Sequence, residues 1–262
     1  MRHRLAIFAL LALACAAGVS AAAGEQVRRG NLEVTFNAGF NPQALPRSRP
    51  GAVTVTVEAG IGTTDGSRPP ALRSFELQLN SHGRIDAHGL PVCRSSELQS
   101  VPTEAALARC RGALVGHGSF RAEVESSESK VPASGRILVF NGRRHGHPLL
   151  LLHLYGTVPV RASFVLPLAI QHRGKHELGT LLAANVPLLA SGLGSITSMK
   201  MTIGRTFSYR GRRHSYLGAS CAAPKGWNVV PFFPFARGVF DFVDGMRLQK
   251  TLERSCRVRS SS

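Results

Sequence analysis

Short runs in which apolar and polar residues alternate recur along most of this chain. The clearest run is AVTVTVEA at residues 52–59, whose three valines fall on one face of an extended chain. Residues 31–37 and 160–170 alternate in the same way, and Asn141-Gly142 is typical of a hairpin turn. The pattern predicts an all-β fold: an antiparallel β-sandwich or flattened barrel of about eleven strands with one short helix.

Two segments depart from this alternation. Residues 148–155 are almost all apolar, which predicts a strand covered on both faces. Residues 103–110 (TEAALARC) favour a helix of two turns, with Thr103 as its N-cap. So short a helix is unstable alone in water, and a bridge between Cys93 and Cys110 would tie it to the sheet.

The first 23 residues predict export. A basic start, an apolar core at residues 5–16 and an Ala-rich end before Gly24 are typical of a signal peptide over residues 1–23. The mature chain, residues 24–262, is then a single disulfide-stapled β domain, either secreted or associated with the cell envelope. A membrane would be reached only through an uncleaved signal or through lipidation at Cys15, and both alternatives are disfavoured.

Four cysteines remain after removal of the signal, and an even number in an exported chain predicts two disulfides. Three pairings are open. The pairing of Cys93 with Cys110 and of Cys221 with Cys256 is favoured because each bond closes a short loop. A metal site made by all four thiolates is the alternative, but the chain has no C-x-x-C motif. We therefore expect no metal and no cofactor.

Basic residues outnumber acidic ones, and removal of Arg2 and Arg4 lowers the formal charge only from +17 to +15. Such a charge invites an anionic envelope polymer or glycan as partner, with no specific nucleic acid indicated. The alternative is an ordinary solvated surface, because the excess is mostly arginine and is scattered along the chain.

One basic cluster is interleaved with tyrosines. The sequence SYRGRRHSY at residues 208–216 predicts a charged hairpin whose tip is Arg210-Gly211-Arg212. Guanidinium groups beside aromatic rings can bind phosphates while the rings stack on bases or sugars. The candidate polyanion-binding residues are Arg210, Arg212, Arg213 and His214. The alternative is a tip that is charged only to remain soluble.

The segment WNVVPFFPF at residues 227–235 is a second candidate. Its two prolines argue against a central strand, so we expect a loop to present its aromatic side chains. These either plug the open end of the sheet or form an exposed patch that binds a glycan or a partner. The residues of this aromatic patch are Trp227, Phe232, Phe233 and Phe235.

The sequence predicts no catalytic residue. It contains no G-x-S-x-G motif, and Asp241, Asp244, Glu123 and Glu125 form no recognisable acid–base pair. His153 lies within the most apolar strand, where an imidazole hydrogen-bonded to a hydroxyl or carbonyl is favoured over a catalytic base.

Several motifs together resemble uncharacterised exported proteins of high-GC Gram-positive bacteria. These motifs are DGSRPP, LPVC, CRGALVG, FSYRGRR, APKG, FPFAR and a closing SCR. The resemblance implies export and a cysteine framework, and it implies no activity. The sequence therefore predicts an exported, non-enzymatic binding or structural module of the cell envelope or extracellular space. The alternative is a carbohydrate- or lipid-active hydrolase whose site is not recognised.

Overall fold

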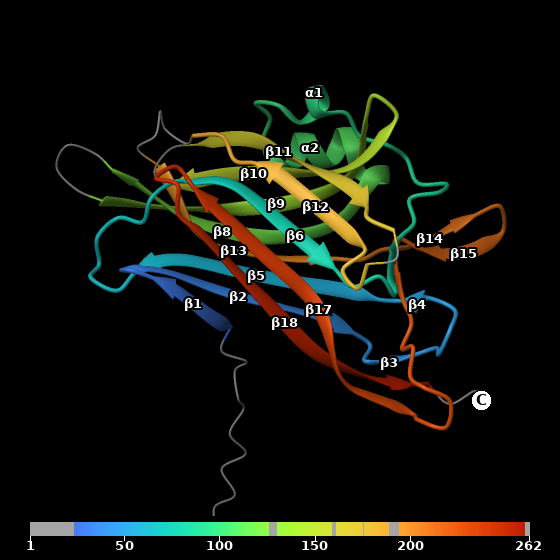
Figure 1. The fold of residues 1–262 in the computed structure, drawn as a ribbon. Helices are drawn as coiled ribbons and strands as arrows, with labels where there is room; N and C mark the ends of the chain where they lie inside the picture. The colour runs from blue at the N-terminus through green and yellow to red at the C-terminus, as the bar shows by residue number, and fades with distance from the viewer. Residues whose placement is uncertain (1–23, 126–129, 159–160, 175, 189–193, 260–262) are drawn as a thin grey trace, which may run out of the picture.

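The computed structural model describes residues 24–125, 130–158, 161–174, 176–188 and 194–259 (Figure 1). Residues 1–23, which carry the predicted signal peptide and Cys15, lie outside the described residues. The described chain is mostly β-strand, so the all-β class is confirmed. None of the described helices is long and apolar enough to cross a membrane.

Thirteen of the described strands form one continuous sheet. In order across the sheet these are β1 (Glu25–Arg29), β2 (Leu32–Asn41), β5 (Thr54–Thr63), β13 (Gly194–Ile203), β8 (Leu114–Glu125), β9 (Lys130–Arg144), β10 (His147–Val158), β11 (Ala162–His172), β12 (Thr180–Asn185), β6 (Leu72–Leu79), β17 (Val229–Phe242), β18 (Arg247–Val258) and β3 (Ala44–Leu45). All neighbours are antiparallel except β18 and β3, which are parallel.

Two small sheets stand beside the large one. One is the hairpin β14 (Thr206–Tyr209) and β15 (Arg212–Ser215), and the other joins β4 (Gly51–Ala52), β16 (Leu217–Ala219) and β7 (Gly83–Ile85). A sandwich of about eleven strands is therefore not confirmed, since the described chain has eighteen strands and most belong to one sheet. Most of the strands that the sequence pattern did not predict are too short to show an alternation.

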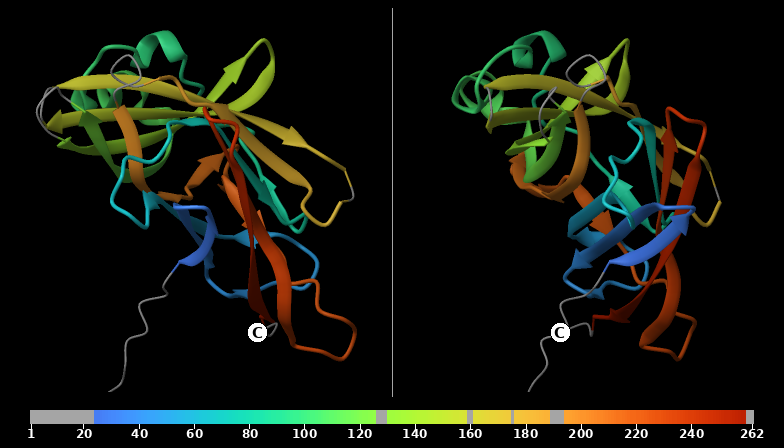
Figure 2. Two further views of the ribbon diagram at one scale, coloured as in Figure 1. Left: turned by 60° about the vertical axis from the view of Figure 1, so that its left-hand side comes forward. Right: turned by 90° about the vertical axis from the view of Figure 1, so that its left-hand side faces the viewer.

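The large sheet curls until β18, next to one edge, approaches β1 and β2 at the other edge (Figure 2). Side chains of β18 reach across to β1 and β2: Lys250 Nζ lies 2.9 Å from Glu25 Oε2, and Arg254 Nε donates to the Ala38 carbonyl at 2.8 Å. The main core fills the concave side. It follows the predicted alternation, as in β2, where Leu32, Val34 and Phe36 are fully buried.

Strand β10 is covered on both faces, as its apolar sequence predicts. Leu150 and Leu152 belong to the main core, whereas Leu149 and Leu151 belong to a second core on the convex side. The short helices α1 (Ser95–Leu98) and α2 (Thr103–Cys110), followed by a 3₁₀ turn η1 (Arg111–Ala113), cover that side. A strand enclosed in this way is nearly continuous in apolar side chains, and His153 is the polar exception among the buried residues of β10.

The bounds of α2 agree with the prediction, but its capping does not. Pro102 occupies the N-cap, and Thr103 is the first helical residue, with its hydroxyl buried and without a hydrogen-bond partner. The predicted turn at Asn141-Gly142 is also wrong, because both residues lie inside β9 and the chain turns at His145-Gly146. Asn141 instead anchors the helical insertion: its side chain donates to the Pro91 carbonyl at 2.9 Å.

Candidate functional site

Both predicted disulfides are confirmed. Cys93 pairs with Cys110, and Cys221 pairs with Cys256, with Cα atoms 5.5 and 5.8 Å apart. The first bond holds the helical insertion against the convex side of the sheet, where the Cys93 amide also donates to the Asn141 carbonyl at 3.0 Å. Two disulfides are consistent with an oxidising compartment outside the cytoplasm.

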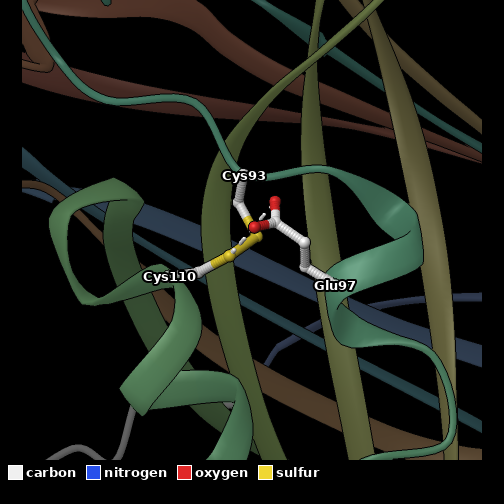
Figure 3. Close-up of side chains that lie close together, drawn as sticks. All are labelled: Cys93, Glu97 and Cys110. Atoms are coloured by element: carbon white, nitrogen blue, oxygen red, sulfur yellow. Dashed lines mark hydrogen bonds between the residues drawn. A yellow bond between two sulfur atoms is a disulfide. The ribbon is translucent and has the colours of Figure 1, made fainter.

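Cys93, Glu97 and Cys110 form a compact cluster whose ligand-type atoms lie within 4.8 Å of one another (Figure 3). The two sulfurs are bonded to each other, so neither is a thiolate that could ligate a metal. Glu97 has another role, because its carboxylate accepts a hydrogen bond from the Arg94 amide at 2.7 Å and so closes the first turn of α1. The cluster therefore has a structural role: it joins α1 and α2 to each other.

The basic cluster at residues 208–216 forms the predicted hairpin. Tyr209 and Arg212 face one another across a two-residue turn, in which Arg210 and Gly211 have φ values of 49° and 72°. The backbone of both residues is in the left-handed region, as a two-residue hairpin turn of type I′ requires. The hairpin projects from one end of the molecule (Figure 1).

The two tyrosines of this cluster serve the fold. The Tyr209 ring lies on the backbone of Gly89, where a Cβ atom would overlap the ring, and its centre is 5.1 Å from that of His88. Tyr216 is fully buried within the main core, and burial raises the pKa of its phenol. The interpretation that these rings stack on bases or sugars is therefore wrong for Tyr216. The Tyr209 ring already packs on Gly89 and His88, which leaves less of it for stacking on a ligand.

The arginines of the hairpin remain exposed and carry uncompensated charge. No ion pair among the described residues includes Arg210, Arg212 or Arg213. The Arg210 guanidinium lies 5.3 Å from the centre of the Tyr209 ring, a cation–π contact that holds its position. His214 is partly buried and stacks on Phe207, with ring centres 5.6 Å apart. The hairpin backbone thus presents three exposed guanidinium groups, of which Arg210 contacts the Tyr209 ring.

The predicted loop at residues 227–235 is wrong from Val229 on, because β17 begins there and pairs with β18; both prolines fit in it because β17 pairs with β6 only from Ala236. The four residues of the predicted aromatic patch divide into two pairs. Phe235 is buried and Phe233 partly buried, and their ring centres lie 5.2 and 6.2 Å from that of Phe40. Trp227 and Phe232 are instead exposed, with 60% and 75% of their surface accessible. One pair plugs this end of the curled sheet, as the first alternative predicts. Trp227 and Phe232 are exposed, as the alternative of an exposed patch predicts.

Arg47 holds the loop that precedes β17, a role that the sequence did not indicate. Its guanidinium donates to the carbonyls of Ala223, Pro224 and Trp227 at 2.6, 2.8 and 2.7 Å. These partners lie about 180 residues further along the chain, so no local pattern could reveal them. With the Cys221–Cys256 bond, this contact fixes the loop in one conformation.

Two apolar hollows lie on the concave side of the sheet. One, of about 40 Å³, is lined by Phe75, Leu152 and Phe240, and the other, of about 60 Å³, is lined by Phe40, Phe233 and Phe235 among others. Both are far smaller than the several hundred Å³ that an organic ligand occupies. They are packing defects of the core.

The carboxylates considered for hydrolysis are not gathered at any of the described hollows. Asp241 accepts from the Ser74 hydroxyl at 3.1 Å and lies 3.3 Å from Arg247, while Asp244 accepts from the Met246 amide in the final turn. Neither they nor Glu123 line these two hollows or the three more open ones, of about 360, 380 and 450 Å³, on the described part of the chain. The side chain of Glu125 lies outside the described residues. The three described carboxylates considered for hydrolysis therefore form no pair across a groove. Glu25 and Glu58 line the hollow of about 360 Å³, and both are ion-paired, with Lys250 and Lys200.

His153 is a core residue, as the sequence favoured. It is fully buried, and its Nε2 donates to the Val101 carbonyl at 2.9 Å, while Nδ1 has no partner in the described chain. Burial disfavours the charged imidazolium and lowers the pKa of this histidine below its usual 6.5.

This lowered pKa predicts a pH-dependent stability. Between the folded and unfolded pKa values the unfolded chain binds one more proton, so the free energy of unfolding rises with pH up to about 6.5 and then levels off. The unsubstituted protein should therefore lose unfolding free energy when the pH is lowered from about 7 to about 5. We expect urea unfolding to show a smaller loss over this range in His153→Gln. His82→Gln, at an exposed histidine, is the control. Equal pH profiles for the unsubstituted protein and His153→Gln would contradict the assignment.

Comparison of the chain with known proteins found no matching family model, curated protein or solved structure.

Proposed function

We propose that this protein is a non-enzymatic binding module of the cell envelope or extracellular space, which engages an anionic envelope polymer through the β14–β15 hairpin. The observation that carries the proposal is the group of three exposed guanidiniums on that hairpin, Arg210, Arg212 and Arg213, with no ion pair among the described residues. Phosphate or sulfate groups spaced along a polymer would neutralise them.

The packing of the hairpin supports this function. Tyr209 packs on Gly89 and His88 outside the hairpin, and His214 stacks on its cross-strand neighbour Phe207, so the backbone that carries the arginines is held in place. A preorganised site loses little conformational freedom on binding. Surface charge alone needs no such support, and this favours a binding role over a merely solvating one.

The double variant Arg212→Ala/Arg213→Ala tests the proposal. We expect its affinity for immobilised heparin, measured at low ionic strength, to fall roughly tenfold, because two exposed charge contacts of up to about 1 kcal/mol each are lost. The melting temperature should remain unchanged, since both side chains are exposed and support no other residue.

A matched control exists in the β9–β10 hairpin. Arg143 and Arg144 are also adjacent, exposed and next to a two-residue turn that ends in glycine. Arg143→Ala/Arg144→Ala removes the same charge and should retain heparin binding. Equal losses in the two variants would show that net charge, and not the β14–β15 hairpin, drives binding.

A further inference from the structure

A second surface lies where β17 begins, beside the end of β18. Its exposed apolar side chains are Trp227, Val229 and Phe232, with 60%, 41% and 75% of their surface accessible. We call these three residues the aromatic tip. In Figure 2 the start of β17 and the loop before it extend from the body of the molecule, near the C-terminal end of the described chain.

A β-bulge turns Phe232 outward. Val230 pairs with Cys256 and Phe233 pairs with Arg254, so Pro231 and Phe232 together oppose the single residue Ser255. The extra residue shifts the alternation, which places Phe233 inward against Phe40 and leaves Phe232 in solvent. Bulges commonly redirect a side chain at the edge of a sheet.

The backbone of the tip is fixed although its side chains are exposed. Arg47 donates to the Trp227 carbonyl, the Val258 amide donates to the Asn228 carbonyl at 2.7 Å, and Cys221 is bonded to Cys256. The fold thus holds two large aromatic side chains in water, where their exposure does not stabilise it.

Three cations lie near the aromatic tip in the chain. Arg257 is directly opposite Val229 and shares its face, and Lys225 lies in the preceding loop. Arg259 follows the end of β18, where its guanidinium donates to the Ala44 carbonyl at 3.2 Å. All three are exposed, and none belongs to an ion pair among the described residues. The described carboxylate nearest in sequence on this hairpin is Glu253, opposite Pro234.

We propose that the aromatic tip docks onto the surface of an anionic phospholipid bilayer. Trp227 and Phe232 enter the boundary between headgroups and acyl chains, while Lys225, Arg257 and Arg259 pair with lipid phosphates. Both rings are exposed, and neither lines a hollow found in the described chain. A planar anionic surface fits an exposed apolar group with cations beside it better than a small ligand does.

The only tryptophan of the chain lies in the tip, so its fluorescence reports docking directly. Titration with phosphatidylglycerol-containing phosphatidylcholine vesicles should shift the Trp227 emission to shorter wavelength, and pure phosphatidylcholine vesicles should give a much smaller shift. An unchanged emission with anionic vesicles overturns the proposal. A shift caused by a soluble glycan but not by vesicles also overturns it.

Vesicle sedimentation of variants provides the second measurement. Trp227→Ala/Phe232→Ala should weaken binding to anionic vesicles by about tenfold or more, because most of the buried apolar area is lost. Leu188→Ala/Val243→Ala removes two exposed apolar side chains outside the tip and should bind as before. All variants carry the same residues 1–23, so any binding by that apolar segment is common to them. Equal binding by the tip variant and the unsubstituted protein overturns the proposal.

The outcome is separable from that of the polymer-binding proposal. Arg212→Ala/Arg213→Ala keeps the aromatic tip and should retain the shift of the Trp227 emission on anionic vesicles. Trp227→Ala/Phe232→Ala keeps the β14–β15 hairpin and should retain heparin binding. Loss of heparin binding in the tip variant would show that the two surfaces are not independent and would overturn a docking role specific to lipid.

Discussion

The Phe240→Ala variant is expected to lose about 3–5 kcal/mol of unfolding free energy. Phe240 is 1% exposed, and its ring centre lies 5.9 Å from that of Phe36 and 5.2 Å from that of Phe75. These contacts join β17 to its neighbour β6 and, across the concave side, to β2. The side chain also lines the hollow of about 40 Å³, so its removal would enlarge an existing cavity.

Urea denaturation measures this loss. Val243→Ala is the control, because Val243 lies just beyond β17 with 51% of its surface exposed, and its truncation should cost less than about 0.5 kcal/mol. A loss below about 1 kcal/mol for Phe240→Ala would mean that the concave side is not a packed core.

Removal of the second disulfide in Cys221→Ser/Cys256→Ser is expected to cost up to about 4 kcal/mol. The bond spans 35 residues, and its loss frees the unfolded chain by the entropy of closing that loop. The native loop before β17 also loses one of its attachments, while those made by Arg47 and by the Val258 amide remain. We therefore expect limited proteolysis to cleave this loop in the variant well before the sheet unfolds.

Cys93→Ser/Cys110→Ser is the matched control for this prediction. That bond spans 17 residues, so its removal should cost up to about 3 kcal/mol and should leave the loop before β17 resistant to protease. Equal protease sensitivity of that loop in both variants would contradict its attachment by Cys221.

Local patterns predicted the local features of this fold. Alternation located β2 and β5, the apolar run at β10 indicated burial on both faces, and the helical composition of residues 103–110 agrees with α2. Loop length alone favoured the correct disulfide pairing. Each of these signals depends on residues within one element or one short loop.

Features that depend on distant contacts could not be read in this way. The curl of the sheet depends on strand order and on β18 side chains that reach β1 and β2. The hairpin of Arg212 was predicted, but the packing of Tyr209 on Gly89, about 120 residues earlier in the chain, was not. The aromatic segment was recognised, yet only the β-bulge decides that Phe232 is exposed and Phe233 is not.

The dependence of heparin affinity on salt concentration tests the central claim most directly. Each phosphate or sulfate neutralised by an arginine releases about one counterion, so the logarithm of affinity falls with the logarithm of salt concentration in proportion to the number of contacts. Binding through the β14–β15 hairpin predicts a slope shallower by about 2 for Arg212→Ala/Arg213→Ala and an unchanged slope for Arg143→Ala/Arg144→Ala. Identical slopes for the unsubstituted protein and the Arg212→Ala/Arg213→Ala variant would contradict the proposed function.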